Sequence, residues 1–333
     1  MAKTSIPVGF VTGFLGSGKT TLIQKALEHP ALKNAAVIIN EFGEVSLDHL
    51  LVAKAADTIV ELRNGCICCT INTDLAMTLR DLHTKRALGE VPYFDYVLVE
   101  TTGLADPGPL IHTLTANPMF SPVFHPDAII TCVDTAHGLR TISEHETAAD
   151  QVALADIIVL TKSDLATPEE HAALIEALDA INPQAERITA SFGNIDPEKL
   201  FRRELYQPKN GDIAHWMGHA HHEHGSGHHH HDHGALYTSH VLKAPGPISL
   251  AGTLVLFDKL VKGAYGQVLR VKGIAQFHGK GEAPAVLHGV QGRFHPMEWL
   301  KAWPDNDHNS RIVVIGRNLD TAAIEEAFQT LCL

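Results

Sequence analysis

The stretch "GFLGSGKT", residues 13–20, decides the fold of the first part of the chain. It matches the pattern G-x-x-x-x-G-K-[ST] at every fixed position, and it lies between an apolar run and a segment with helical spacing. A strand, this loop and a helix, in that order, form a P-loop. Its glycines let backbone N–H groups approach phosphate oxygens, and the helix N-terminus adds a positive dipole. We predict that Lys19 reaches the β- and γ-phosphates and that Thr20 holds Mg²⁺.

Apolar runs alternate with amphipathic segments over the first two-thirds of the chain. Runs of Val, Ile and Leu that are almost continuous indicate strands buried on both faces, as in a parallel sheet. The segments between them have the spacing of helices, and this alternation predicts a doubly wound α/β domain. The predicted strands are residues 7–13, 35–40, 57–62, 96–101, 128–134 and 156–162. The predicted helices are residues 19–29, 73–88, 147–155 and 167–182.

The last hundred residues have a different pattern. Predicted strands at 267–277, 283–294 and 310–319 follow one another with only turns between them, and predicted helices at 248–265 and 321–333 flank them. Such an order favours a smaller α+β domain. We therefore predict a P-loop GTPase domain over 1–212, a His-rich linker or loop over 213–236, and a C-terminal domain over 237–333.

The residues at the ends of two further predicted strands favour GTP as the nucleotide. "TKSD", residues 161–164, resembles the N-K-x-D guanine motif, with Thr161 in place of asparagine. In that motif the carboxylate, here Asp164, accepts two hydrogen bonds that adenine cannot supply, and the stem of Lys162 covers the base. "ETTG" ends the predicted strand 96–101, so Glu100 is expected to serve Mg²⁺ and the Gly103 N–H to meet the γ-phosphate.

Three of the five cysteines, Cys66, Cys68 and Cys69, fall within four positions of the chain. They precede a predicted helix, and a helix N-terminus favours thiolates. Thiolates are soft ligands that prefer Zn²⁺ to Mg²⁺, and three of them leave a fourth tetrahedral position open. A metal site is the favoured interpretation, and a redox pair of Cys66 and Cys69 also fits. Cys132 is predicted to be a core residue.

Histidines are concentrated between residues 215 and 240, where 11 of the 23 lie. Imidazole binds Zn²⁺, Ni²⁺, Co²⁺ and Cu²⁺, so a flexible stretch of this kind is suited to capture or buffer metal. A solvated linker of biased composition is the alternative.

The bulk properties exclude some classes of protein. A net charge of −12 argues against general binding to nucleic acid, which needs a basic surface. No run is long and apolar enough for a membrane span, and the N-terminus has no signal-peptide pattern. We therefore expect a cytoplasmic protein with reduced thiols. A homo-oligomer remains open.

At this point the sequence resembles a CobW-type metallochaperone GTPase, of the family that includes CobW and the nitrile hydratase activators. The resemblance covers nearly the whole chain. It is carried by "GFLGSGKTTL", "NEFGEVSLD", "NGCICC", "ETTGLADPGP", "LTKSDL" and "VLRVKG".

The resemblance implies GTP hydrolysis coupled to transfer of a transition metal, usually zinc with cobalt or nickel as alternatives, into a client metalloprotein. It also implies a role for each matching residue. Gly13, Gly16, Ser17, Gly18, Lys19, Thr20 and Thr21 would hold phosphate and Mg²⁺. Glu100 would belong to the ligand shell of Mg²⁺, and Lys162 and Asp164 would bind the guanine. The transition metal would be bound by Cys66, Cys68 and Cys69. Glu41 and Glu44 are further candidates for the metal site.

Two other functions remain open from the sequence. One is a P-loop kinase of a small metabolite, which would transfer phosphate to an acceptor without needing the thiols. The other is a metal-storage or redox-sensing protein with a regulatory nucleotide site. It would show high metal stoichiometry or a reversible disulfide without turnover.

Overall fold

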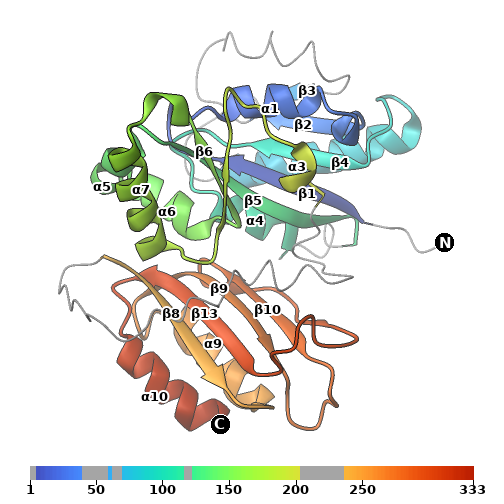
Figure 1. Cartoon of the computed structure of the whole chain (residues 1–333). Helices are drawn as coiled ribbons and strands as arrows, with labels where there is room; N and C mark the ends of the chain where they lie inside the picture. The colour runs from blue at the N-terminus through green and yellow to red at the C-terminus, as the bar shows by residue number, and fades with distance from the viewer. Residues whose placement is uncertain (1–4, 40–58, 62–69, 116–121, 203–235) are drawn as a thin grey trace. The chain divides into compact units, whose positions relative to one another are not determined.

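The structure is a computed structural model that describes residues 5–39, 59–61, 70–115, 122–202 and 236–333 (Figure 1). The chain divides into two compact units, residues 1–176 with 187–206 and residues 177–186 with 207–333. No described helix is both long and apolar enough to cross a bilayer.

The first unit contains a seven-stranded sheet in the order β3-β2-β4-β1-β5-β6-β7. All the registers described from β3 through β6 are parallel. The strands are β1 (Ile6–Thr12), β2 (Ala35–Ile39), β3 (Ile59–Glu61), β4 (Tyr96–Glu100), β5 (Phe124–Asp134), β6 (Ile157–Thr161) and β7 (Glu186–Thr189). The helices are α1 (Lys19–Leu27), α3 (Thr70–Leu88), α4 (Gly108–Thr115), α5 (Gly138–Glu144), α6 (Glu146–Leu154) and α7 (Pro168–Ile181), of which residues 177–181 are assigned to the second unit. Short 3₁₀ helices are η1 (Pro30–Leu32), η2 (Ser163–Leu165) and η3 (Pro197–Lys199).

This sheet confirms the predicted doubly wound α/β class. Every residue of β2, β4 and β6 is buried, as expected of strands covered on both faces. Strands β2, β3 and β4 lie toward one edge of the sheet from β1, and the later strands β5 to β7 lie toward the other edge. Because crossovers between parallel strands are right-handed, the reversal of direction places helices on both faces (Figure 1). In such sheets ligands bind at the carboxyl ends of the strands where the direction reverses, which is beside β1.

Some elements of the first unit were not predicted. The strand β7 is four residues long and carries two charged side chains, so it lacks the apolar run of its neighbours. The helices α4 and α5 are short, and both begin with a glycine, which is a poor helix former. Strand β5 begins four residues before the predicted start at 128, because Phe124 to Asp127 are buried despite a histidine, a proline and an aspartate.

The second unit is an antiparallel sheet with two helices, which confirms the α+β prediction. Its order is β11-β10-β9-β13-β8, with β12 paired to β10. The strands are β8 (Tyr237–Ala244), β9 (Gln267–Ala275), β10 (Ala285–Val290), β11 (Arg293–Phe294), β12 (Glu298–Trp299) and β13 (Ser310–Arg317). The helices are α9 (Leu250–Val261) and α10 (Thr321–Cys332). Strand β8 was not predicted, and residues 283–294 form a hairpin of β10 and β11 instead of one strand.

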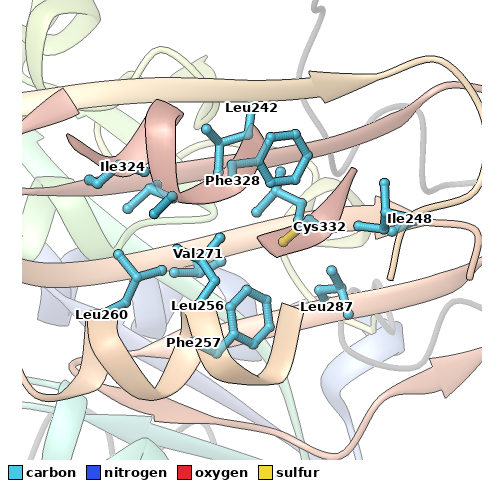
Figure 2. Close-up of a cluster of buried hydrophobic side chains, with 14 of the residues drawn as sticks. Leu242, Ile248, Leu256, Phe257, Leu260, Val271, Leu287, Ile324, Phe328 and Cys332 are labelled. Atoms are coloured by element: carbon cyan, nitrogen blue, oxygen red, sulfur yellow. The ribbon is translucent and has the colours of Figure 1, made fainter. Parts of the chain in front are cut away.

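Helices α9 and α10 pack on one face of this sheet, and Figure 2 shows the core between them. Leu256, Phe257 and Leu260 come from α9, and Ile324 and Phe328 from α10. Side chains of Ser249 and Asp320 accept hydrogen bonds from the first turns of the two helices and so define where each begins.

Gly252 allows α9 and α10 to pack closely. A Cβ built at Gly252 would overlap the backbone carbonyl oxygen of Leu331, which no side-chain rotation can relieve. We expect Gly252→Ala to destabilise the protein by about 2–3 kcal/mol in urea unfolding, although alanine favours a helix by about 1 kcal/mol. Ala251→Gly, at the exposed neighbouring position, is the control and should cost about 1 kcal/mol. Stabilisation by Gly252→Ala would contradict this contact.

Candidate nucleotide site

The P-loop connects the end of β1 at Thr12 to the start of α1 at Lys19. Three of its glycines have positive φ, with 137° at Gly13, 72° at Gly16 and 89° at Gly18. A side chain at Gly13 would also collide with the carbonyl oxygen of Cys132 on β5. The loop therefore needs glycine at these positions, both for backbone conformation and for close approach to the sheet.

Lys19 is held inside this loop. Its Nζ donates hydrogen bonds to the carbonyl oxygens of Gly13 at 2.9 Å and Phe14 at 3.0 Å, and the residue is only 8% exposed. The carbonyl oxygens of the loop thus fix the ammonium group, and its contact with phosphate stays a prediction.

Thr20 and Glu100, which are 80 residues apart in sequence, meet beside the P-loop. The Thr20 hydroxyl donates to Glu100 Oε1 at 2.9 Å, and Glu100 is buried at the carboxyl end of β4. A hydroxyl and a carboxylate are hard oxygen ligands of the kind that Mg²⁺ prefers. The donor set therefore fits the predicted Mg²⁺ ion.

The segment after Glu100 lies against the P-loop. Thr101 donates from its backbone N–H to Val11 O at 3.0 Å and from its hydroxyl to Thr12 Oγ1 at 2.9 Å. At Gly103, a Cβ would stand 2.6 Å from the backbone nitrogen of Leu15. The two backbones approach so closely that position 103 has no room for a side chain.

The predicted guanine segment follows β6 and contacts the same loop. Thr161 Oγ1 donates to Ser17 O at 2.8 Å, so the hydroxyl supports the P-loop where asparagine stands in the usual motif. Lys162 has a positive φ of 53°, and its Nζ donates to Gly16 O at 2.7 Å and to Asp134 Oδ2 at 2.8 Å. Asp164 lies in η2 with its residue exposed. These contacts bring the segment to the P-loop, and its role in base recognition stays a prediction.

Asp134 at the end of β5 is a site residue that the sequence analysis missed. Burial alone would raise the pKa of its carboxyl group, but hydrogen bonds from Lys162 and from the His137 N–H outweigh burial and lower the pKa. Asp134 therefore remains ionised and orients Lys162. Its position at the end of an apolar strand, like that of Glu100, was the signal available in the sequence.

A cavity of about 200 Å³ lies beside the P-loop, between β5 and the helices α5 and α6. Its walls include Phe14, Cys132, Ile142, Gln151 and Val152. Burial raises the pKa of the Cys132 thiol to about 12, so this cysteine is an unreactive core residue, as predicted.

The predicted metal ligands Cys66, Cys68, Cys69 and Glu44, together with Glu41, lie outside the described residues. The cysteines belong to the connection between the end of β3 at Glu61 and the start of α3 at Thr70. Among the residues that the structure describes, no group of three His, Cys, Asp or Glu side chains is placed to hold a metal ion.

A strand, P-loop and helix with an acidic strand end beside them define a P-loop nucleotide-binding protein. Residues 7–189 match the CobW/HypB/UreG nucleotide-binding domain, and residues 237–332 match the cobalamin synthesis protein cobW C-terminal domain. The chain belongs to this CobW family of P-loop GTPases, which confirms the resemblance noted in the sequence.

Similar proteins cover nearly the whole chain. The zinc chaperone YjiA of Escherichia coli is 33% identical over 98% of both chains. The zinc chaperone CobW of Pseudomonas aeruginosa is 32% identical, over 98% of this chain and 91% of its own. The crystal structure of the Zn(II)-bound YjiA GTPase from E. coli has a TM-score of 0.76 at 28% identity, covering 98% of this chain and 99% of that one.

Proposed function

We propose that this protein hydrolyses GTP, binds zinc at Cys66, Cys68 and Cys69, and delivers the zinc to a client metalloprotein. The observation that carries the proposal is the convergence of Lys19, Glu100 and Gly103 on the P-loop of a chain in which the thiol segment follows a strand, β3, of the same sheet. The names of its relatives, zinc chaperones and a GTPase, support the same activity.

In the hydrolytic step the protein would act by positioning and by charge. The P-loop N–H groups and Lys19 bind the phosphates and stabilise negative charge as the bond to the γ-phosphate breaks. The Gly103 N–H contacts the γ-phosphate, while Lys162 and Asp164 bind guanine. Thr20 and Glu100 would hold Mg²⁺, which neutralises phosphate charge when it is bound.

The sheet topology supports coupling between hydrolysis and zinc. Strand β3 runs parallel to β2 and, through β4, to β1, so its end at Glu61 lies on the same sheet edge as the P-loop. Three strand spacings separate β3 from β1, which corresponds to about 14 Å. The thiol segment therefore starts near the nucleotide, and ordering of its neighbours by the γ-phosphate would change the geometry of the thiols.

The remaining parts of the proposal concern the rest of the chain. The His-rich segment, predicted over 213–236, captures metal, and the C-terminal unit recognises the client. Cobalt or nickel are alternatives to zinc on the same ligands. Thiolates stay reduced in the cytoplasm, where we place the reaction.

The coupling predicts that zinc affinity depends on the nucleotide. We expect the zinc dissociation constant to differ about tenfold between the complexes with GDP and with a non-hydrolysable GTP analogue. Zinc must then change the ratio of the two nucleotide affinities by the same factor, because coupling between two sites is reciprocal. Competition with a chromophoric chelator measures the first quantity, and calorimetry with each nucleotide measures the second.

The variant with Cys66, Cys68 and Cys69 all replaced by serine is the control for this titration. Zinc that it still binds, for example on histidines, should have the same affinity with both nucleotides. Equal zinc affinities in the unmodified protein would reject the coupling, and absence of GTP hydrolysis would reject the enzymatic part.

A further inference from the structure

In the segment that follows Glu100, the backbone lies very close to the P-loop at Gly103, a residue with a flexible backbone. Thr102 to Ala105 form a turn in which the Ala105 N–H donates to Thr102 O at 3.0 Å. Gly103 lies within this turn, and it must be glycine because of Leu15. Glycine has the greatest backbone freedom of any residue, so the turn needs an external contact to keep the Gly103 N–H directed in one way.

Gln151 on α6 provides such a contact. Its Nε2 donates to the carbonyl oxygens of Gly103 at 3.2 Å and Ala105 at 3.0 Å, so both amide hydrogens are used on the turn. The residue is 1% exposed, so its carboxamide is held inside the protein. The backbone of Gln151 is itself anchored, because Thr131 Oγ1 on β5 donates to its carbonyl oxygen at 2.8 Å.

We infer that Gln151 is a positioning residue for the γ-phosphate, since it holds the turn in the conformation that presents the Gly103 N–H to the nucleotide site. The inference rests on the proposed GTPase function. It adds that discrimination between GTP and GDP depends on a glutamine that touches neither nucleotide. The P-loop holds one side of Gly103 and Gln151 holds the other, so loss of the carboxamide releases the turn on the α6 side.

The effect should be selective for the triphosphate. GDP has no γ-phosphate, so its affinity does not depend on Gly103. The affinity for a GTP analogue does depend on Gly103. When the turn is released, the analogue must restrict the turn as it binds, and this cost lowers its affinity. A purely structural role of Gln151 would instead weaken both nucleotides together, through general loss of stability.

The test replaces the carboxamide by an apolar side chain of similar length. In Gln151→Met we expect the affinity for a non-hydrolysable GTP analogue to fall about tenfold, the turnover of GTP to fall by a similar factor, and the affinity for GDP to stay within about twofold. Gln329→Met is the matched control, because Gln329 on α10 is exposed and bonds only Glu325 among the contacts described; it should change none of the three quantities.

Equal weakening of GDP and analogue, or no change in a folded Gln151→Met variant, would overturn the inference. If that variant does not fold, Gln151→Asn keeps the amide but is one methylene too short to reach both carbonyls, and the same selective loss is expected. Failure of the unmodified protein to hydrolyse GTP would reject the proposed function instead, so the two failures are distinguishable.

Discussion

Replacement of Lys19 by alanine is expected to lower the rate of GTP hydrolysis by at least about a hundredfold. Lys19 is buried within the P-loop, where two carbonyl oxygens accept hydrogen bonds from its ammonium group, and in the proposed function this group binds the β- and γ-phosphates. Lys162 also contacts this loop, but its ammonium group is paired with Asp134, so we do not expect it to replace Lys19. Release of inorganic phosphate at saturating GTP measures the effect.

Lys25→Ala is the matched control for Lys19→Ala. Lys25 lies on the same helix, α1, but its exposed ammonium group pairs only with Glu28 among the described contacts. Such surface pairs contribute little, so hydrolysis should remain unchanged. A Lys19→Ala protein that folds and hydrolyses GTP at the original rate would exclude Lys19 from the reaction.

Simultaneous replacement of Cys66, Cys68 and Cys69 by serine should weaken zinc binding by at least about a thousandfold. Thiolates supply most of the affinity of zinc sites, where binding reaches about 10–16 kcal/mol, and serine hydroxyls are poor ligands. Basal GTP hydrolysis should be largely preserved, because Lys19, Thr20 and Glu100 contact one another or the P-loop without the cysteines. Chelator competition and phosphate release measure the two properties on one sample.

Cys332→Ser tests whether the effect belongs to the three clustered cysteines. Cys332 is buried at the end of α10, where burial raises the pKa of its thiol, and the same chemical exchange there should leave zinc affinity unchanged. A triple variant that retains tight zinc binding would move the metal site elsewhere. A triple variant that loses basal hydrolysis would make the cysteines part of the hydrolytic apparatus.

Local sequence patterns predicted the central strands, the P-loop and the two-part organisation correctly. Strands such as β4 and β6 are short apolar runs whose residues are all buried, so their identity follows from composition. The strand β7 and the division of β10 from β11 were missed, because polar edge strands and tight hairpins leave weak signals. In the described part of the candidate site, Lys19, Glu100 and Lys162 could be predicted because each belongs to a motif of fixed spacing, and the structure has all three beside the P-loop.

The sequence alone therefore determined the class of the protein and predicted its phosphate-binding and thiol sites, since these depend on residue types at short, fixed separations. The motifs placed Thr20 and Glu100 at one Mg²⁺ site, but only the tertiary structure brought Asp134 to Lys162 and Gln151 to Gly103. Each of these two pairs joins separate elements of the sheet and its helices, 28 and 48 residues apart. No local pattern encodes such contacts, because they arise from the order in which parallel strands assemble.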